Sequence, residues 1–209
     1  MYIPTSFREE DEEVLAEFIA RHSFATLVGR VDGAPYATHL PFVHEREQGL
    51  LIGHIARANP QWRDLQGEEA LIVFQGPHAY ISPSYYAADF AVPTWNYAAV
   101  HVYGVSRVVE DQTRLAAIVE QLTERYEGGR AKPWHVDWND ERYGKMLQAI
   151  VGIEVEITRV EGKFKLNQNR PEKDQLGVVV ALTESADAEE RALAGLMAAG
   201  MKAGDGARD

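Results

Sequence analysis

One long stretch of the chain, from Ala70 to Ser106, carries almost no charge and many aromatic residues. Asp89 is its single formal charge, although Asp, Glu, Lys and Arg make up 25% of the whole sequence. Alternating aromatic residues fill the interior of β structures, which predicts buried strands here. Between Ile81 and Thr94 two prolines interrupt that alternation, which predicts a loop. An uncharged aromatic loop suits a planar heteroaromatic ligand, a subunit interface, or both.

Composition excludes several classes of protein. The 209 residues contain 21 Lys and Arg against 32 Asp and Glu, a formal net charge of −11, which argues against charge-driven binding to nucleic acid or anionic membranes. The absence of cysteine excludes disulfides, thiolate metal sites and a cysteine nucleophile. The N-terminus lacks the pattern of a signal peptide, and the longest apolar run, Val178 to Leu182, is too short to span a membrane. We therefore expect a cytoplasmic protein without a membrane segment.

Local signals place the first helices and turns. Asp11 is an N-cap for a helix whose apolar residues fall on one face, and Asp111 begins a second such helix. Asp32-Gly33 supplies the positive φ angles of a tight hairpin, and Asn59-Pro60 predicts the start of a short helix. Strands are expected over Phe24–Val28, Tyr36–Val43, Leu50–Ile55, Ala70–Gln75, Ala79–Ser82 (after a break at Gly76-Pro77) and Asn96–Val109. The last is long enough to cross more than one sheet or to bend at Gly104.

The second half of the chain adds one more alternating strand and further helices. Ile153, Val155 and Ile157 alternate with Glu154 and Glu156, which predicts one buried and one solvated strand face. A short helix is expected through Tyr143, Met146 and Leu147, and an Ala-rich terminal helix from Asp187 to Lys202.

The order of elements predicts an α+β fold, mainly β, built on an antiparallel barrel or sheet with peripheral helices. It lacks the alternation of strands and helices typical of parallel nucleotide-binding sheets. The expected organisation is one domain over residues 1–182 and a helical tail over residues 183–209.

Two shorter segments suit an anion. From His54 to Pro60 a strand end leads into a helix start, where free N–H groups and Arg57 would attract a phosphate. The same residues also fit a surface charge and a simple cap by Asn59. From Gly162 to Arg170, alternation gives a small basic and amide-rich strip that could meet a phosphate or the edge of a ring, and that also fits a solvated strand edge. The strip consists of Lys163, Lys165 and Asn167.

Metal and catalytic signatures are missing from the sequence. The seven histidines form no recognised ligand pattern, and there is neither a serine-hydrolase nor a phosphate-loop motif. We therefore predict no metal site, and the sequence assigns no catalytic residue. No helix-turn-helix or basic recognition helix is found, which argues against direct binding to DNA.

Long motifs resemble those of the PaiB-type FMN-binding negative transcriptional regulators, from residue 1 to about Leu182. They read Met1-Tyr2-Ile3-Pro4, Ala37-Thr38-His39-Leu40-Pro41-Phe42, Gly53-His54-x-Ala56-Arg57-Ala58-Asn59-Pro60, Phe74-Gln75-Gly76-Pro77-His78-Ala79-Tyr80-Ile81-Ser82-Pro83, Pro93-Thr94-Trp95-Asn96-Tyr97, Ala149-Ile150-Val151-Gly152-Ile153-Glu154 and Gly162-Lys163-Phe164-Lys165-Leu166-Asn167-Gln168-Asn169-Arg170-Pro171.

The resemblance implies an FMN-binding split β-barrel of the pyridoxamine-phosphate-oxidase type, with FMN at the interface of a homodimer. It implies a negative regulator or flavin-dependent sensor, or alternatively an FMN-dependent oxidoreductase in which Tyr97, His39 or His101 could move protons. Where the oxidases usually carry Arg and Lys, this chain has Thr38, Ala58 and Pro60, so the resemblance implies either weaker phosphate binding or a phosphate that depends on Arg57 and Lys165. The implied cofactor-binding residues are Thr38, His39, Leu40, His54, Arg57, Asn59, Trp95, Asn96, Lys165 and Gln168.

Overall fold

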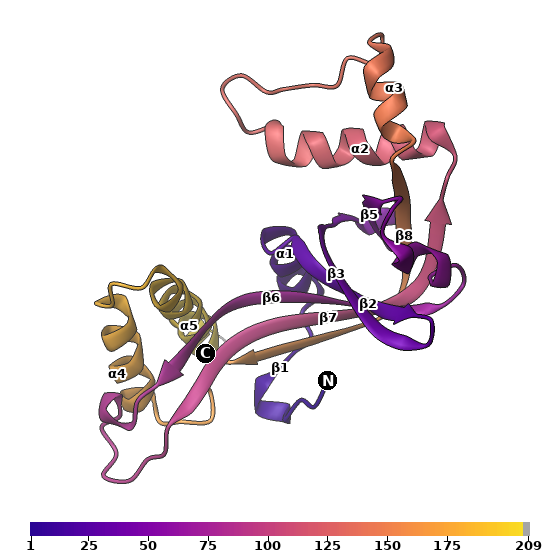
Figure 1. Ribbon diagram of the computed structural model, residues 1–209. Coiled ribbons are helices and arrows are strands. Elements are labelled where there is room, and N and C mark those ends of the chain that lie inside the picture. Colours follow the sequence, from indigo (N-terminus) through magenta and orange to yellow (C-terminus); the bar gives the residue numbers. More distant parts are fainter. Residues whose placement is uncertain (207–209) are drawn as a thin grey trace. The chain divides into compact units, whose positions relative to one another are not determined.

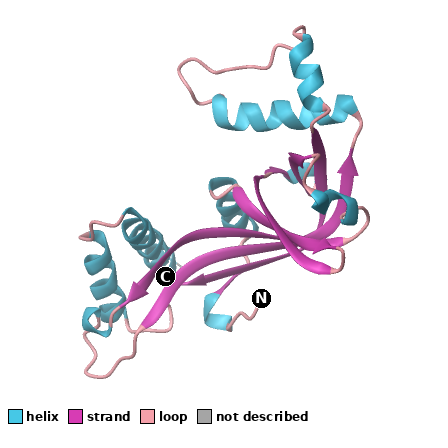
Figure 2. Ribbon diagram, viewed as in Figure 1, coloured by secondary structure: helices cyan, strands magenta, loops and turns pink. Residues whose placement is uncertain are grey.

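The computed structural model describes the backbone of residues 1–206 and the side chains of residues 1–201. Its elements are drawn in Figure 1 and coloured by type in Figure 2. Residues 207–209, the end of the expected helical tail, lie outside the described residues. The strands are β1 (Arg8–Glu9), β2 (Phe24–Val31), β3 (Ala34–Pro41), β4 (Val43–Glu45), β5 (Leu50–Ala56), β6 (Glu69–Ile81), β7 (Thr94–Val109) and β8 (Ile150–Lys165). The α-helices are α1 (Glu12–Arg21), α2 (Gln112–Glu127), α3 (Glu141–Leu147), α4 (Glu172–Thr183) and α5 (Ala188–Gly206), and four 3₁₀ turns are η1 (Thr5–Phe7), η2 (Arg46–Gln48), η3 (Pro60–Asp64) and η4 (Pro83–Tyr85).

Within the described residues the strands form one eight-stranded sheet in the order β3-β2-β6-β7-β8-β5-β4, with β1 beside β8. The pairs β2/β3, β2/β6, β4/β5, β5/β8 and β1/β8 are antiparallel. Strands β3 and β5 stand near opposite ends of this order, yet they pack against each other. Gly53 permits the approach, because a Cβ there would lie 2.9 Å from Pro41 O. The sheet therefore closes into the antiparallel split barrel that the sequence predicts, with helices at its periphery.

The chain divides into two compact units, which are described separately. The barrel unit comprises Glu12–Phe74 and Val100–Val160. The extension unit comprises Met1–Asp11, Gln75–Ala99 and the chain from Glu161 on, and in it α4 and α5 pack against each other (Figure 1). The predicted division into residues 1–182 and 183–209 remains a prediction.

Local sequence signals produce the expected turns and caps. Asp32 and Gly33 have φ angles of 52° and 78°, which turn β2 into β3. The Asn59 side chain accepts a hydrogen bond from Gln61 N and caps η3, with Pro60 at its first position. Asp111 caps α2 by accepting from Arg114 N. Each of these turns and caps depends only on residues close by in the sequence, so local sequence patterns predict them correctly.

The predicted break at Gly76-Pro77 is wrong, because β6 runs unbroken from Glu69 to Ile81. The register of β6 with β2 reaches Val73, where it pairs with Thr26. Pro77 lies beyond that pairing with β2, and a strand accommodates a proline where its nitrogen faces an edge without ladder hydrogen bonds. The two predicted strands are therefore one. The bend expected at Gly104 coincides with a close approach, since a Cβ there would lie 2.3 Å from Glu156 O.

The prediction that Glu154 lies on a solvated face is also wrong, because its side chain is 0% exposed. Arg114 Nε donates to Glu154 Oε1 at 2.5 Å, and Arg107 pairs with the other carboxylate oxygen. Arg114 also donates to Glu45 Oε2 at 3.0 Å. A buried carboxylate needs such partners to offset its loss of hydration. Beside this charge cluster lies an apolar core, formed by Ile52, Val109, Ile118 and Leu122.

We expect Glu154→Gln to lower the free energy of unfolding by about 1–2 kcal/mol, because a neutral amide at this buried position replaces charge-assisted hydrogen bonds to Arg107 and Arg114 with weaker ones. The loss is smaller than for a fully isolated charge, since Glu45 still pairs with Arg114. Urea unfolding measures it. Glu156→Gln is the matched control, two residues along the same strand and exposed, and we expect a change within about 0.5 kcal/mol. Equal effects of the two substitutions would contradict the assigned role of Glu154.

Candidate functional site

In the barrel unit, two of the predicted site residues meet where β3 faces the start of η3. Asn59 Nδ2 donates to Thr38 Oγ1 at 2.8 Å, while Asn59 Oδ1 accepts from Gln61 N. The next side chain, His39, is exposed, and its Nδ1 lies 3.0 Å from Thr26 Oγ1. Leu40 is buried in the core. The structure therefore brings Thr38 and Asn59 together and leaves their polar groups largely engaged with each other.

Arg57, predicted to bind phosphate, has other partners in the barrel unit. Its Nη1 donates to Glu110 Oε2 at 2.6 Å, and its Nε donates to Gln148 O at 2.9 Å. Its Nη2 donates to Ile150 O at 3.3 Å, and the guanidinium lies 5.8 Å from the centre of the Trp62 ring. The guanidinium thus connects the end of β5 to the start of β8. These contacts agree with the alternative interpretation of this segment, in which Arg57 is a surface charge and Asn59 caps a helix. Its phosphate role remains a prediction.

His54 lies half-buried on β5, opposite Gly152 of β8. Its Nδ1 is buried and has no hydrogen-bond partner among the described residues. Burial lowers the pKa of this histidine below its ordinary value of 6.5, because the charged ring would lose its hydration. The ring is therefore neutral at neutral pH.

The extension unit carries a group of aromatic rings on β6 and β7, which we call the aromatic face: His78, Tyr80, Trp95 and Tyr97. The Trp95 ring lies between two of the others, with centroids 6.1 Å from that of His78 and 6.1 Å from that of Tyr80. Trp95 is 54% exposed and Tyr80 is 47% exposed. Tyr97 follows Trp95 by two residues, so strand alternation places both on the same side of β7. Trp95 and Tyr80 are therefore large aromatic rings that no described residue covers fully.

Two lysines of β8 accompany the aromatic face. Lys165 Nζ donates to Trp95 O at 2.5 Å and to Thr94 Oγ1, and burial together with the charge of Lys163 lowers its pKa. Lys163 Nζ donates to Tyr2 O at 3.0 Å and lies 5.2 Å from the centre of the Tyr97 ring. In the described structure the hydrogen bonds of both lysines go to neutral oxygens. Lys163 and Lys165 lie on one face of β8, as alternation predicts, although Lys163 is buried. Asn167 does not continue this strip, because it follows the end of β8, has a φ of 66° and is buried.

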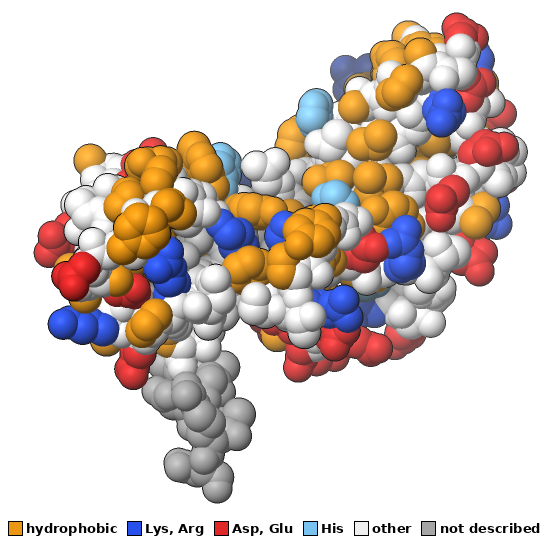
Figure 3. Space-filling model, turned by 90° about the horizontal axis from the view of Figure 1, so that it is seen from below, with side chains coloured by type: hydrophobic (Ala, Val, Ile, Leu, Met, Phe, Trp, Pro, Cys, Tyr) orange, Lys and Arg blue, Asp and Glu red, His pale blue; other side chains and the backbone are white. Residues whose placement is uncertain are grey.

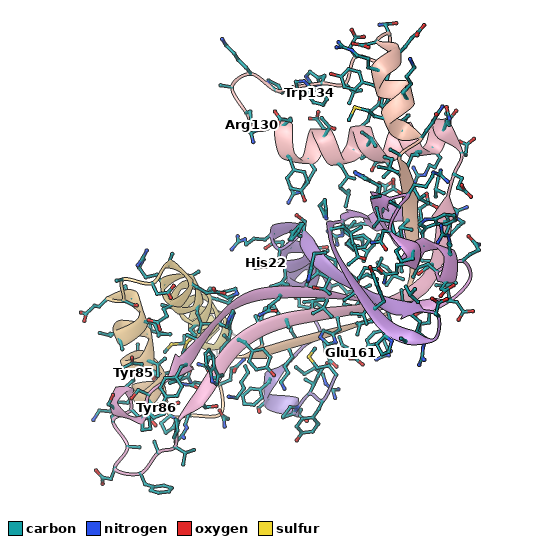
Figure 4. The ribbon with its side chains drawn as sticks, viewed as in Figure 1. His22, Tyr85, Tyr86, Arg130, Trp134 and Glu161 are labelled. Atoms are coloured by element: carbon teal, nitrogen blue, oxygen red, sulfur yellow. The ribbon has the colours of Figure 1, made fainter. Side chains whose placement is uncertain are left out.

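The loop expected between Ile81 and Thr94 is present and is anchored at its beginning, where Figure 4 labels Tyr85 and Tyr86. Buried Asp174 of α4 accepts hydrogen bonds from Ala87 N and Ala88 N through Oδ1. Asn167 Nδ2 donates to Tyr86 Oη at 3.3 Å. The first part of the loop is therefore fixed to α4 and to Asn167 before the chain continues to Thr94 and Trp95.

The remaining predicted residues of this unit lie apart from the aromatic face. Asn96 is fully buried, and its Nδ2 lies 3.6 Å from Met197 Sδ of α5, on the side of β7 opposite to Trp95. Gln168 accepts from Leu166 N and donates to Phe164 O, which closes the turn after β8. Their roles as cofactor ligands remain predictions, and these contacts give Asn96 a place against α5 and Gln168 a place in a turn.

Sequence reasoning left His78 and Tyr80 out of the predicted site, and it included Lys163 only in the basic strip and Tyr97 only as a group that could move protons. The spacing of His78 from Tyr80, and of Trp95 from Tyr97, is the period of two that places side chains on one strand face. The wrongly expected break at Gly76-Pro77 separated the first pair from the strand that precedes it. The expected break therefore concealed the alternation that places His78 and Tyr80 on one face of β6.

These residues fit a flavin mononucleotide. Exposed rings suit stacking on a planar heteroaromatic ring, and lysines bonded to neutral oxygens suit a phosphate. The fit to a metal is poor, since no group of three or more His, Asp or Glu residues lies together in the described part of the chain.

Comparison with known proteins agrees with this chemistry. A family profile described as "Putative FMN-binding domain" matches residues 1–159. The chain is 39% identical over 204 residues to "Protease synthase and sporulation protein PAI 2" of Bacillus subtilis, covering 94% of this chain and 96% of that protein. The chain belongs to the PaiB-type family of FMN-binding proteins. An uncharacterized protein of Emericella nidulans is similar to this PaiB-type chain, at 31% identity over 86% of this chain and 89% of the relative.

Solved structures share the fold of this PaiB-type chain at low sequence identity. The flavocytochrome Anf3 of Azotobacter vinelandii superposes with a TM-score of 0.59 at 16% identity, covering 76% of this chain and 69% of that one. The FAD and heme binding protein of Mycobacterium smegmatis gives 0.58 at 19% identity, with 76% and 73% covered. The family gives this chain a flavin cofactor, as the resemblance predicts. None of the helices in the described residues is long and apolar enough to cross a membrane.

The lowered pKa of His54 makes stability depend on pH. The unfolded chain binds a proton near pH 6.5 and the folded chain does not, so stability falls as the pH drops below 6.5 and is unaffected by this group above it. Each such histidine contributes a slope of up to about 1.4 kcal/mol per pH unit. We expect His54→Gln to reduce the difference in unfolding free energy between pH 7.5 and pH 5.5. His135→Gln, on an exposed loop, serves as the control, and an unchanged difference in His54→Gln would refute the assignment.

Proposed function

We propose that this PaiB-type chain is an FMN-binding sensor that acts as a negative regulator of transcription. The observation that carries FMN binding is the aromatic face with Lys165 beside it, a positive charge whose hydrogen bonds go to neutral oxygens. The regulatory role is supported by the relative in Bacillus subtilis, which is named for protease synthesis and sporulation.

The flavin ring is proposed to stack on Trp95, the most exposed ring of the aromatic face. The phosphate is proposed to bind Lys165 in preference to Arg57. The guanidinium of Arg57 is already held by a carboxylate and two carbonyl oxygens, so a phosphate would have to compete with them. The ammonium of Lys165 has no such charged competitor among its described hydrogen bonds.

A cytoplasmic homodimer with FMN at its interface is part of the same proposal. Exposed aromatic rings are enriched at interfaces, and Tyr80, Trp95 and Phe90 of the extension unit are all exposed. Figure 3 supports this, because hydrophobic side chains interleaved with Lys and Arg side chains lie open on the surface it shows. A ligand and a second subunit could thus cover the same kind of surface.

Regulation is proposed to be indirect. The net charge of −11 opposes binding to a polyanion, and the arginines of α2 are engaged elsewhere. Arg114 pairs with Glu45 and Glu154, and Arg125 donates to Ala20 O. Because both arginines have partners within the protein, we do not propose α2 as a recognition helix for DNA. The regulatory signal is proposed to be the state of the bound flavin.

A flavin oxidoreductase is the second candidate. When bound, FMN supplies hydride and electron transfer, and the chain would need to orient the substrate and hold a proton. Tyr97 favours this candidate, because its hydroxyl-bearing ring lies on the aromatic face beside the Lys163 ammonium. Of the other candidates, His39 is hydrogen-bonded to Thr26, and His101 lies half-buried on β7 in the barrel unit.

We expect Lys165→Met and Trp95→Leu each to weaken FMN binding about tenfold, through loss of a charge-assisted contact and of stacking respectively. Titration of full-length protein into FMN, followed by flavin fluorescence, measures the dissociation constant. Lys173→Met, an exposed lysine of α4, is the control and should bind as the wild type does. A larger loss in Arg57→Met than in Lys165→Met would move the phosphate to the barrel unit, and absence of FMN binding would refute the proposal.

Three further measurements separate the candidate functions. A regulator that acts indirectly gives no sequence-specific mobility shift with promoter DNA at either about 50 mM or about 200 mM salt. Bleaching of bound FMN by NADH or NADPH with turnover of an acceptor favours the oxidoreductase. A specific shift that survives the higher salt would instead establish direct DNA binding and overturn the indirect mechanism.

A further inference from the structure

His78 is the imidazole of the aromatic face, and a carboxylate lies beside it. The imidazole projects from β6, and its Nδ1 lies 2.9 Å from Glu189 Oε1 in the first turn of α5. The side chain of His78 is 39% exposed, yet the Nδ1 atom itself is buried, and the carboxylate beside it is close in distance without the angle of a hydrogen bond. The exposed part is therefore the remainder of the ring, which includes the Nε2 edge.

The carboxylate has a chemical consequence for the ring. A carboxylate beside Nδ1 favours the form in which Nδ1 carries the proton, and this leaves Nε2 for a second partner. The His78 ring is inclined by 33° to the ring of Trp95, with 6.1 Å between centroids. A planar molecule resting on Trp95 would thus have a nitrogen of fixed orientation close to its rim.

The pair contributes too little to folding to be explained by stability alone. Glu189 is 49% exposed, and a contact between side chains this open to solvent is worth at most about 1 kcal/mol. Moreover, the carboxylate lies at one nitrogen of the ring, and the other nitrogen has no partner among the described hydrogen bonds, so a ligand could reach it. Substitution of either residue should leave a folded protein.

We propose that His78 is a ligand-binding residue of the aromatic face and that Glu189 is its positioning residue. His78 Nε2 hydrogen-bonds the polar edge of the heteroaromatic ring that stacks on Trp95, the edge at which a flavin carries its carbonyl and imide groups. This rests on the proposed FMN site and adds to it the group that selects a ring with a polar edge over a purely apolar one.

The test compares FMN dissociation constants of full-length variants, measured by flavin fluorescence. His78→Phe keeps a ring beside Trp95 and removes both nitrogens, and it should weaken binding about tenfold. His78→Gln restores a polar group near the position of Nε2 and should stay within about threefold of the wild type. Glu189→Gln should weaken binding about threefold. Glu190→Gln, the next acidic residue of the same helical turn, is the matched control and should have no effect.

A double-mutant cycle distinguishes positioning from a structural role. Because Glu189 acts through His78, Glu189→Gln should cause no further loss in the His78→Phe background. A helix-stabilising role of Glu189 would give the same loss in both backgrounds, and that result would overturn the positioning role.

The outcomes also separate this inference from the proposed function. Unchanged binding in His78→Phe, with weakened binding in Trp95→Leu, overturns the role of His78 and leaves the flavin site in place. Absence of FMN binding by the wild type overturns both. Three results together support the assignment. FMN binding weakens about tenfold in His78→Phe and is restored in His78→Gln, and Glu189→Gln causes no further loss in the His78→Phe background.

Discussion

The carboxylate of Glu154 joins four elements of the barrel unit at one buried point. It comes from β8 and meets Arg107 of β7 and Arg114 of α2, and Arg114 continues to Glu45 of β4. A charge in this position is tolerated only while every partner is in place, so the helix and the strands must assemble together. Because α2 is fixed in this way, its apolar side packs over the core formed by Ile52, Val109, Ile118 and Leu122.

Strand alternation determines what the extension unit can present. On β7, Asn96 points to α5 while Trp95 points the other way, and on β8 Lys163 and Lys165 alternate with buried Phe164. One side of β7 therefore accepts α5, and the other carries the exposed ring of Trp95, while Lys163 is buried and Lys165 half-buried on one face of β8. The family's cofactor is a planar anion, and the proposed site combines aromatic rings with positive charge.

The sequence predicts correctly the features that depend on near neighbours. Asp32-Gly33, Asn59-Pro60 and Asp111 act within four residues of themselves, and the structure confirms each. Features that depend on distant residues are missed. Glu154 reads as solvated because the arginines that bury it lie about 40 residues earlier in the chain.

The candidate site follows the same division. The shared face of Lys163 and Lys165 on β8 is predicted, since alternation is local, and so is the loop that leads to Trp95. The place of Asn167 is not, because β8 ends before it. The engagement of Arg57 by Glu110 and Gln148 is not, because these partners are 53 and 91 residues away. His78 and Glu189 are also far apart in the sequence, and no local pattern predicts that they lie close together.

The length of β8 has a consequence for how this family can change. Sixteen residues run without interruption from Ile150 to Lys165, and the face that each side chain occupies depends on whether its count along the strand is odd or even. Inserting one residue after Glu156 would send Phe164 outward and turn both lysines toward the opposite side. Insertions and deletions in this strand are therefore admissible in pairs, whereas single ones require a bulge to absorb them. The number of residues between two positions of β8 therefore matters more than the identity of any one residue, because it determines which side chains share a face.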